Sequence, residues 1–114
     1  MKTDTARREK RRFERIPARN LVSFAYLAPE RQEEQPDGLA RTLDVCAGGA
    51  RVETDSALEV GERLRLEIAL GSMIVRAEAT VIHVGISADS MTEAGVVFDR
   101  IPAPDRETLT ALGY

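Results

Sequence analysis

The sequence contains one cysteine, Cys46, and one histidine, His83. A lone cysteine cannot form a disulfide within the chain, and these two residues cannot supply the four ligands of a structural zinc site, so we expect no metal. No apolar run approaches the roughly 18 residues that a membrane-spanning helix requires, so we expect no membrane span. The first twenty residues are charged where a signal peptide would be apolar, and we therefore expect a cytoplasmic protein.

The sequence also shows no recognisable set of catalytic residues. A hydrolase triad requires a base and an orienting acid around a nucleophile, and His83 has no partner that the sequence identifies. The 19 carboxylates are too many for one acid–base pair to stand out, and no Walker A motif is present. Cys46, beside two glycines, is either an activated thiol or a small, partly buried residue. We therefore expect a binding protein with no cofactor and not an enzyme.

The charge of the chain is unevenly distributed. Residues 1–19 carry eight cationic and three acidic side chains, a net charge of +5, whereas the remainder carries eight cationic and sixteen acidic ones, a net charge of −8. Fourteen of the 16 cations are arginine, whose guanidinium group suits phosphates and the O6 and N7 acceptors of guanine. The basic segment indicates either an anionic or nucleotide partner, or an arm that makes only weak contact with nucleic acid.

Alternation of apolar and polar residues predicts short strands over most of the remaining chain. The clearest strand is 63–70, where four large aliphatic residues face one way and three of the four intervening residues are charged. Gly48 and Gly49 predict a tight turn between two strands. The loss of alternation after Val81 predicts a β-bulge. The six predicted strands lie at about 21–27, 39–45, 50–54, 63–70, 74–84 and 95–99.

A short helix is predicted at 105–112, because acidic residues stand in its first turn and Gly113 can end it. The helix is too short to be stable alone, so we expect it to cover an open side of the sheet. The 114 residues are 43% hydrophobic and 31% charged, which leaves room for one domain with one core. Six short strands without crossover helices predict an all-β fold, either an antiparallel sandwich or a small closed barrel.

Two segments resemble the motifs of the PilZ domain, a small bacterial β-barrel whose family binds the second messenger cyclic di-GMP. Residues 11–17 (RRFERIP) are similar to the RxxxR motif before the first strand of the family. Residues 44–52 (DVCAGGARV) are similar to the (D/N)xSxxG motif at the turn between its second and third strands. RxxxR begins at four positions in this arginine-rich segment, and only the aromatic and aliphatic neighbours select the copy that begins at Arg11. Cys46 departs from the family pattern, because it replaces the serine.

The resemblance implies a six-stranded antiparallel PilZ-like β-barrel at residues 11–114, with a short C-terminal helix, after a flexible basic N-terminal arm at residues 1–10. It also implies that the ligand is cyclic di-GMP. The ligand-binding residues that it implies are Arg11, Arg15, Asp44, Cys46, Ala47, Gly48 and Gly49, and the possible further ones are Arg8, Arg12 and His83.

Cyclic di-GMP is a dianion with two guanine bases, and the sequence offers a candidate residue for each kind of contact that it requires. The two motif arginines can fork onto a phosphate or onto guanine O6 and N7. Asp44 can accept hydrogen bonds from guanine N1–H and N2–H₂, and the glycine turn can present backbone N–H groups to the ligand. His83 has two interpretations: it stacks on a guanine, or it is a half-exposed residue that fills the bulge.

The resemblance therefore implies a cyclic di-GMP receptor or adaptor whose basic arm becomes ordered over the ligand and signals to an unidentified effector protein. The alternative is a degenerate PilZ-like interaction module with weak or no ligand binding, because Cys46 replaces the serine. A third class, nonspecific nucleic-acid binding through the arm, is disfavoured by the acidic body of the chain.

Overall fold

The computed structural model describes residues 16–17, 19–27 and 37–114. In chain order, its elements are β1 (Ile16–Pro17), β2 (Leu21–Tyr26), β3 (Gly38–Cys46), β4 (Gly49–Thr54), β5 (Arg63–Leu70), β6 (Met73–Ile86), β7 (Thr92–Arg100) and the helix α2 (Ala103–Ala111). All six predicted strands and the predicted helix are present, with bounds that differ by a few residues.

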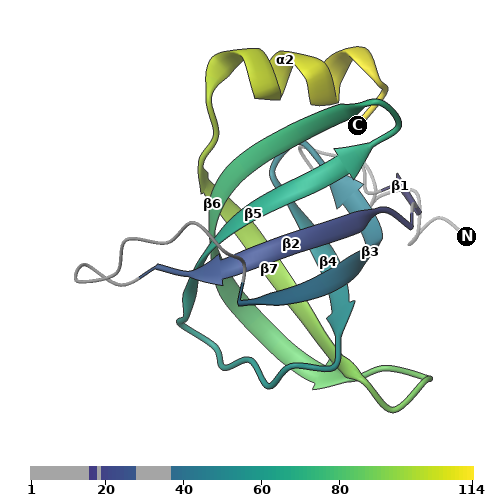
Figure 1. Ribbon diagram of the computed structural model, residues 1–114, viewed down its shortest axis with the longest axis vertical. Coiled ribbons are helices and arrows are strands. Elements are labelled where there is room, and N and C mark those ends of the chain that lie inside the picture. The colour runs from purple at the N-terminus through teal and green to yellow at the C-terminus, as the bar shows by residue number, and fades with distance from the viewer. Residues whose placement is uncertain (1–15, 18, 28–36) are drawn as a thin grey trace, which may run out of the picture.

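The strands form one closed antiparallel barrel in the order β3-β2-β5-β6-β7-β4, because β4 pairs again with β3 (Figure 1). Closure leaves these six strands with neighbours on both sides, which removes the exposed edges that promote aggregation. The short strand β1 pairs with β3 beyond the end of β2. The structure therefore confirms the six-stranded antiparallel barrel and decides between the two predicted architectures.

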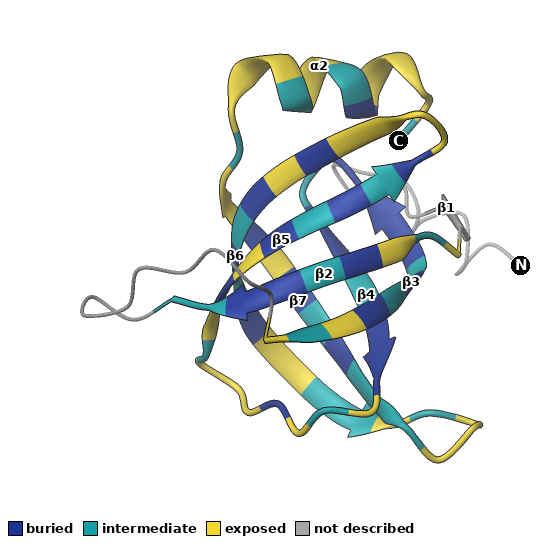
Figure 2. Ribbon diagram, viewed as in Figure 1, coloured by how far each residue is buried: buried dark blue, intermediate teal, exposed yellow. Residues whose placement is uncertain are grey.

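The core fills the barrel interior, and the strand alternation creates it. On β5, the four aliphatic side chains of the predicted apolar face are buried, and the residues between them are exposed or half-buried. Figure 2 shows the same striping on the neighbouring strands. Each fully buried Leu, Ile or Val side chain stabilises the fold by about 1.5–3 kcal/mol relative to its exposed state, so the alternation fixes which face of each strand is internal.

Helix α2 lies across one end of the barrel, as Figure 1 shows. Leu109 is its one buried residue and is completely buried within the core cluster. Gly113 ends the helix with a φ of +93°, a conformation that favours glycine, and the Tyr114 N–H donates to the Leu109 carbonyl at 2.9 Å. The predicted helix and its glycine stop are confirmed.

Two β-bulges change which face of the strand the side chains point to, one next to Asp44 and one next to His83. Thr42 faces the core and is fully buried, but the register shifts before Asp44. A register shift also lies between Val81 and His83, where the sequence predicts a bulge. Because a one-residue shift moves side chains to the other face of a strand, these bulges direct Asp44 and His83 to the outside of the barrel.

Candidate functional site

Four residues on four neighbouring strands lie directly opposite one another. Asp44 pairs with Arg51, Arg51 pairs with Gly95, and Gly95 pairs with His83. Ala50 and Val52 belong to the core, so Arg51 and its partners point outward. With strands about 4.8 Å apart, this outward row spans roughly 14 Å on the barrel surface. Two residues that the sequence singles out, Asp44 and His83, lie at the opposite ends of this row, on the same outer face.

Arg51 joins Asp44, its neighbour in this row, to Glu93, which lies outside the row on β7. Its Nε–H donates to Asp44 Oδ2 at 2.8 Å, and its Nη1–H donates to Glu93 Oε2 at 2.5 Å. The hydrogen bond to Asp44 is the main cause that raises the pKa of Arg51, so the guanidinium stays cationic. Asp44 is buried, whereas the side chain of Arg51 is 41% exposed. The site therefore contains a carboxylate fixed beside an accessible cation.

Sequence reasoning missed Arg51 as a site residue, although it lies within the motif-like segment 44–52. A signal for it was available. A two-residue turn at 47–48 pairs Cys46 with Gly49, and counting back two residues on each strand places Asp44 opposite Arg51. Glu93 was also missed, and no local pattern marks it because β7 lies about 40 residues further along the chain.

The glycine-containing turn is held in place from two sides. The Phe98 N–H on β7 donates to the Gly48 carbonyl at 2.9 Å, and Arg106 Nη1 on α2 donates to the Ala47 carbonyl at 3.3 Å. Gly49 allows the strands to approach closely, because a Cβ at this position would lie 2.3 Å from the Val96 carbonyl oxygen. Cys46 is buried and unpaired with another cysteine, which fits the small, partly buried residue better than the activated thiol.

The predicted arginines Arg8, Arg11, Arg12 and Arg15 lie outside the described residues. Ile16 and Pro17, which follow the RxxxR motif directly in sequence, pair with Val45 and Asp44. The strand β1 therefore lies beside the motif carboxylate on β3.

His83 lies at the far end of the outward row and is exposed. Gly95, opposite it, has no side chain, and a Cβ there would lie 3.7 Å from the His83 Cβ. The aliphatic neighbours Ile82 and Val97 are also exposed, by 57% and 39%. An imidazole among exposed apolar groups provides a surface on which a flat ring can stack. Its binding role stays a prediction.

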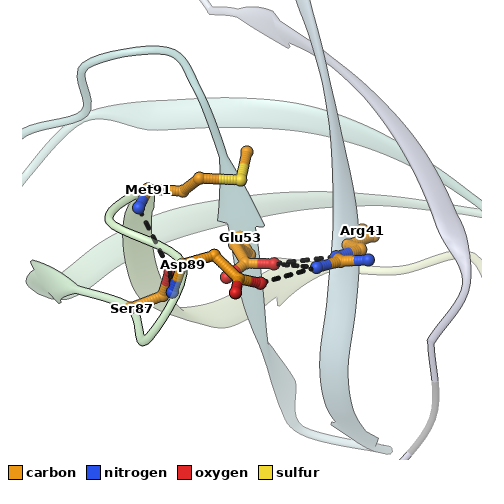
Figure 3. A network of polar contacts seen from close by, with 5 residues as sticks. All are labelled: Arg41, Glu53, Ser87, Asp89 and Met91. Atoms are coloured by element: carbon orange, nitrogen blue, oxygen red, sulfur yellow. Dashed lines mark hydrogen bonds and ion pairs between the residues drawn. The ribbon is translucent and has the colours of Figure 1, made fainter.

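A second arginine–carboxylate cluster lies further along the same hairpin (Figure 3). Arg41 on β3 places Nε and Nη2 each 2.7 Å from Glu53 Oε1 on β4, and Nη2 also contacts Asp89 at 3.2 Å. Glu53 is only 3% exposed, and hydrogen bonding from Ser87, followed by Arg41, lowers its pKa. Ser87 Oγ accepts from the Met91 N–H at 3.2 Å. This cluster fixes the β6–β7 loop against the barrel.

A shallow hollow of about 430 Å³ lies beside this second cluster. Leu21, Leu39 and Met91 provide its apolar lining, together with Arg41 and Glu53. It contains none of the residues that the sequence predicts for ligand binding.

In the described part of the chain, no group of three or more His, Cys, Asp or Glu side chains is arranged to hold a metal. None of its helices is long and apolar enough to cross a membrane.

Comparisons with known proteins identify the fold. The PilZ domain family model matches residues 9–113, and no curated protein matches the sequence. The chain is similar to the Bacillus subtilis inhibitor of motility MotI/DgrA, with 22% identity and a TM-score of 0.72 over 90% of this chain and 49% of that one. It is also similar to the PilZ domain of Escherichia coli YcgR, whose structure contains c-di-GMP, with 18% identity and a TM-score of 0.67 over 90% of this chain and 88% of that one.

A third similar structure is the PilZ domain of CeSA from a cellulose-synthesizing bacterium, with 18% identity and a TM-score of 0.60 over 87% of this chain and 93% of that one. The chain spans about half the length of the Bacillus protein and most of each isolated PilZ domain. At these identities the structural similarity establishes the fold. The family model covers nearly the whole sequence, in agreement with the two motif-like segments, and the chain belongs to the PilZ domain family.

Proposed function

We propose that the chain is a cyclic di-GMP receptor that signals through an effector protein and carries out no chemistry of its own. The observation that carries the proposal is the pairing of β1, whose residues follow the RxxxR motif directly in sequence, with the part of β3 that contains Asp44. The two motifs are 33 residues apart in sequence. The pairing supports simultaneous contact of both motifs with a single compact ligand.

The residues of the outward row suit the chemistry of this ligand. Cyclic di-GMP is a dianion with two guanine bases, and guanine presents its N1–H and N2–H₂ groups side by side. Asp44 accepts from these donors, Arg11 and Arg15 bind phosphate or guanine O6 and N7, and His83 stacks on a base. The ligand also contacts backbone groups of the glycine turn, at Cys46, Ala47, Gly48 and Gly49. Arg8 and Arg12 are additional cations for its phosphates.

The output is a change in the basic arm. Arginines that gain partners on the ligand would order the segment before Ile16 across the barrel, and the new surface would bind the effector. The similar proteins support an adaptor role, since one is named as an inhibitor of motility and another was solved with c-di-GMP. The effector and the cytoplasmic location stay predictions.

Isothermal titration calorimetry with cyclic di-GMP tests the proposal. We expect a dissociation constant in the micromolar range or tighter for the wild-type chain, and no measurable heat of binding for Asp44→Ala. Asp89→Ala is the matched control, because it removes an aspartate that also contacts an arginine but lies in the second cluster. Binding equal to wild type in both variants would contradict the role of Asp44.

Arg15→Ala tests the contribution of the arm, and Arg65→Ala, which removes an exposed arginine on β5, is its control. We expect the first variant to abolish binding and the second to leave it unchanged. Heat indistinguishable from buffer dilution in the wild-type chain would overturn the receptor proposal. That outcome would favour the interaction-only module, for which the buried thiol at the usual serine position is the supporting observation.

A further inference from the structure

Arg51 holds both of its carboxylate partners through different nitrogen atoms. Nε contacts Asp44 on the preceding strand of the hairpin, and Nη1 contacts Glu93 on β7. A planar guanidinium that is fixed at two points has little freedom to rotate, and each charge-assisted hydrogen bond is short and directional. Arg51 thus links Asp44 to a strand on the far side of the hairpin, and the link restrains the plane of the Asp44 carboxylate.

That restraint bears on which base the site accepts. A carboxylate recognises guanine by accepting from N1–H and N2–H₂ together, which requires its two oxygens to lie in the plane of the base. A carboxylate free to rotate would satisfy one donor at a time. A site built to pair with a polar group discriminates strongly against an analogue that lacks the group, provided that the pairing geometry is held.

We propose that Arg51 is a positioning residue that, with Glu93, aligns Asp44 so that the site selects guanine through its N2 amino group. This inference rests on the proposed function. It assigns Arg51 no direct contact with the ligand. Its effect is on the preference between bases and not only on affinity.

The chain contains a matched control for this inference. Arg41 makes the same kind of contact, with Nε and Nη2 on the buried Glu53 and a further contact to Asp89. It lies on β3, as Asp44 does, but contacts neither Asp44 nor the glycine turn among the contacts that the structure describes. Arg41→Met therefore removes an equivalent arginine from the outer face of the barrel without releasing the motif carboxylate.

Titration with cyclic di-GMP and with its inosine analogue, which lacks both N2 amino groups, tests the inference. We expect the wild-type chain to bind cyclic di-GMP about tenfold more tightly than the analogue, a difference of about 1.4 kcal/mol, because the analogue cannot donate the N2 hydrogen bond to the charged carboxylate. Arg51→Met should weaken cyclic di-GMP binding about tenfold, change the analogue by less than threefold, and nearly abolish the preference. Glu93→Gln should reduce the preference by about threefold, and Arg41→Met should preserve it.

Arg51→Lys separates positioning from charge. A single ammonium group retains the charge but cannot form the two-point contact, so we expect it to leave the preference low. Full recovery in this variant would show that Arg51 acts as a point charge on phosphate and would overturn the inference. An equal loss for both ligands in Arg51→Met would indicate a merely structural role and would also overturn it.

The two proposals fail in different ways. If the wild-type chain gives no heat with cyclic di-GMP, both fall. If it binds and loses binding in Asp44→Ala, but keeps its preference in Arg51→Met, the receptor stands and only this inference is rejected. Thermal melting of each variant checks folding. If Arg51→Met does not fold, the charge-preserving Arg51→Lys and the substitution Glu93→Gln decide the result.

Discussion

The β3–β4 hairpin carries two arginine–carboxylate clusters with nearly the same chemistry and different surroundings. Arg51 contacts Asp44 and Glu93, and Arg41 contacts Glu53 and Asp89. Beside the first cluster lie a glycine turn, a glycine strand position and the junction of the basic arm. The β6–β7 loop contacts the second cluster through Asp89, which pairs with Arg41, as Figure 3 shows.

Ion pairs on the same face of a sheet can therefore differ in what surrounds them, although their own chemistry is alike. Glycines and the strand β1 lie next to the first cluster, whereas a loop contacts the second through Asp89, beside a shallow hollow. The Arg51 cluster is accordingly the candidate for binding, and the Arg41 cluster is the candidate for stabilising the fold. Glu53 and Glu93 stand directly opposite each other, so the two clusters meet at a pair of like charges.

The largest change in stability is expected at Gly49, the glycine beside the first cluster. Gly49→Ala places a Cβ 2.3 Å from the Val96 carbonyl oxygen, so the backbones of β4 and β7 must move apart. We expect a loss of about 1–3 kcal/mol in the free energy of unfolding, the usual cost of overpacking. Urea denaturation measures this change.

Gly95→Ala is the control, because its Cβ would meet only the His83 Cβ at 3.7 Å, an ordinary contact. We expect its unfolding free energy to lie within about 0.5 kcal/mol of wild type. Equal destabilisation by both substitutions would show that the tight approach at Gly49 is not what closes the barrel.

The next largest effect is a pH dependence of stability that we expect from the Arg41 cluster. Hydrogen bonding from Ser87, followed by Arg41, lowers the pKa of Glu53 in the folded protein below its ordinary value of 4.5. The stability that this carboxylate contributes is therefore fully present above pH 4.5 and is lost as the pH falls through the lowered folded-state pKa. The difference in melting temperature between wild type and Glu53→Gln should shrink as the pH falls through this window.

Ser87→Ala removes the largest cause of the Glu53 pKa shift and should weaken the same pH dependence. Melting curves recorded between pH 7 and pH 3 provide the measurement. Parallel profiles for wild type and both variants would contradict the assignment of the Arg41 cluster to stability.

The smallest predicted effect concerns the departure from the motif. Cys46→Ser should tighten cyclic di-GMP binding by a factor of several, because an ordinary hydrogen bond contributes about 0.5–1.5 kcal/mol. Cys46→Ala should not tighten it. Binding that is absent in wild type and appears only in the serine variant would transfer support to the interaction-only module.

Local patterns were sufficient to predict most of the fold. Alternation located six strands, the failure of alternation after Val81 located a bulge, and Gly113 located the end of the helix. The strand β1 was not predicted, because two residues are too few to show a period. Bounds differed by a few residues where pairing with a neighbouring strand extends a segment beyond its own alternation, as at β7.

For the candidate site, the sequence supplied Asp44, the glycine turn and His83, and the structure added Arg51 and Glu93. The arginines of the RxxxR motif lie outside the described residues, so their role is a proposal. Asp44 and Arg51 share a short hairpin, whose register can be counted from the turn. Glu93 and His83 are 42 residues and 32 residues from Arg51, and pairing at such separations leaves no local signal.

The sequence by itself determined which face of most strands is buried, where the chain turns, and that an arginine-rich segment precedes an aspartate-headed hairpin, because these features depend on residue types and on period. Only the tertiary structure decided which residues face each other. Barrel closure and two bulges place Asp44, Arg51, Gly95 and His83 in one outward row. The physical reason is that cross-strand register follows from packing the whole core at once, and a shift of one residue moves a side chain from the interior to the surface.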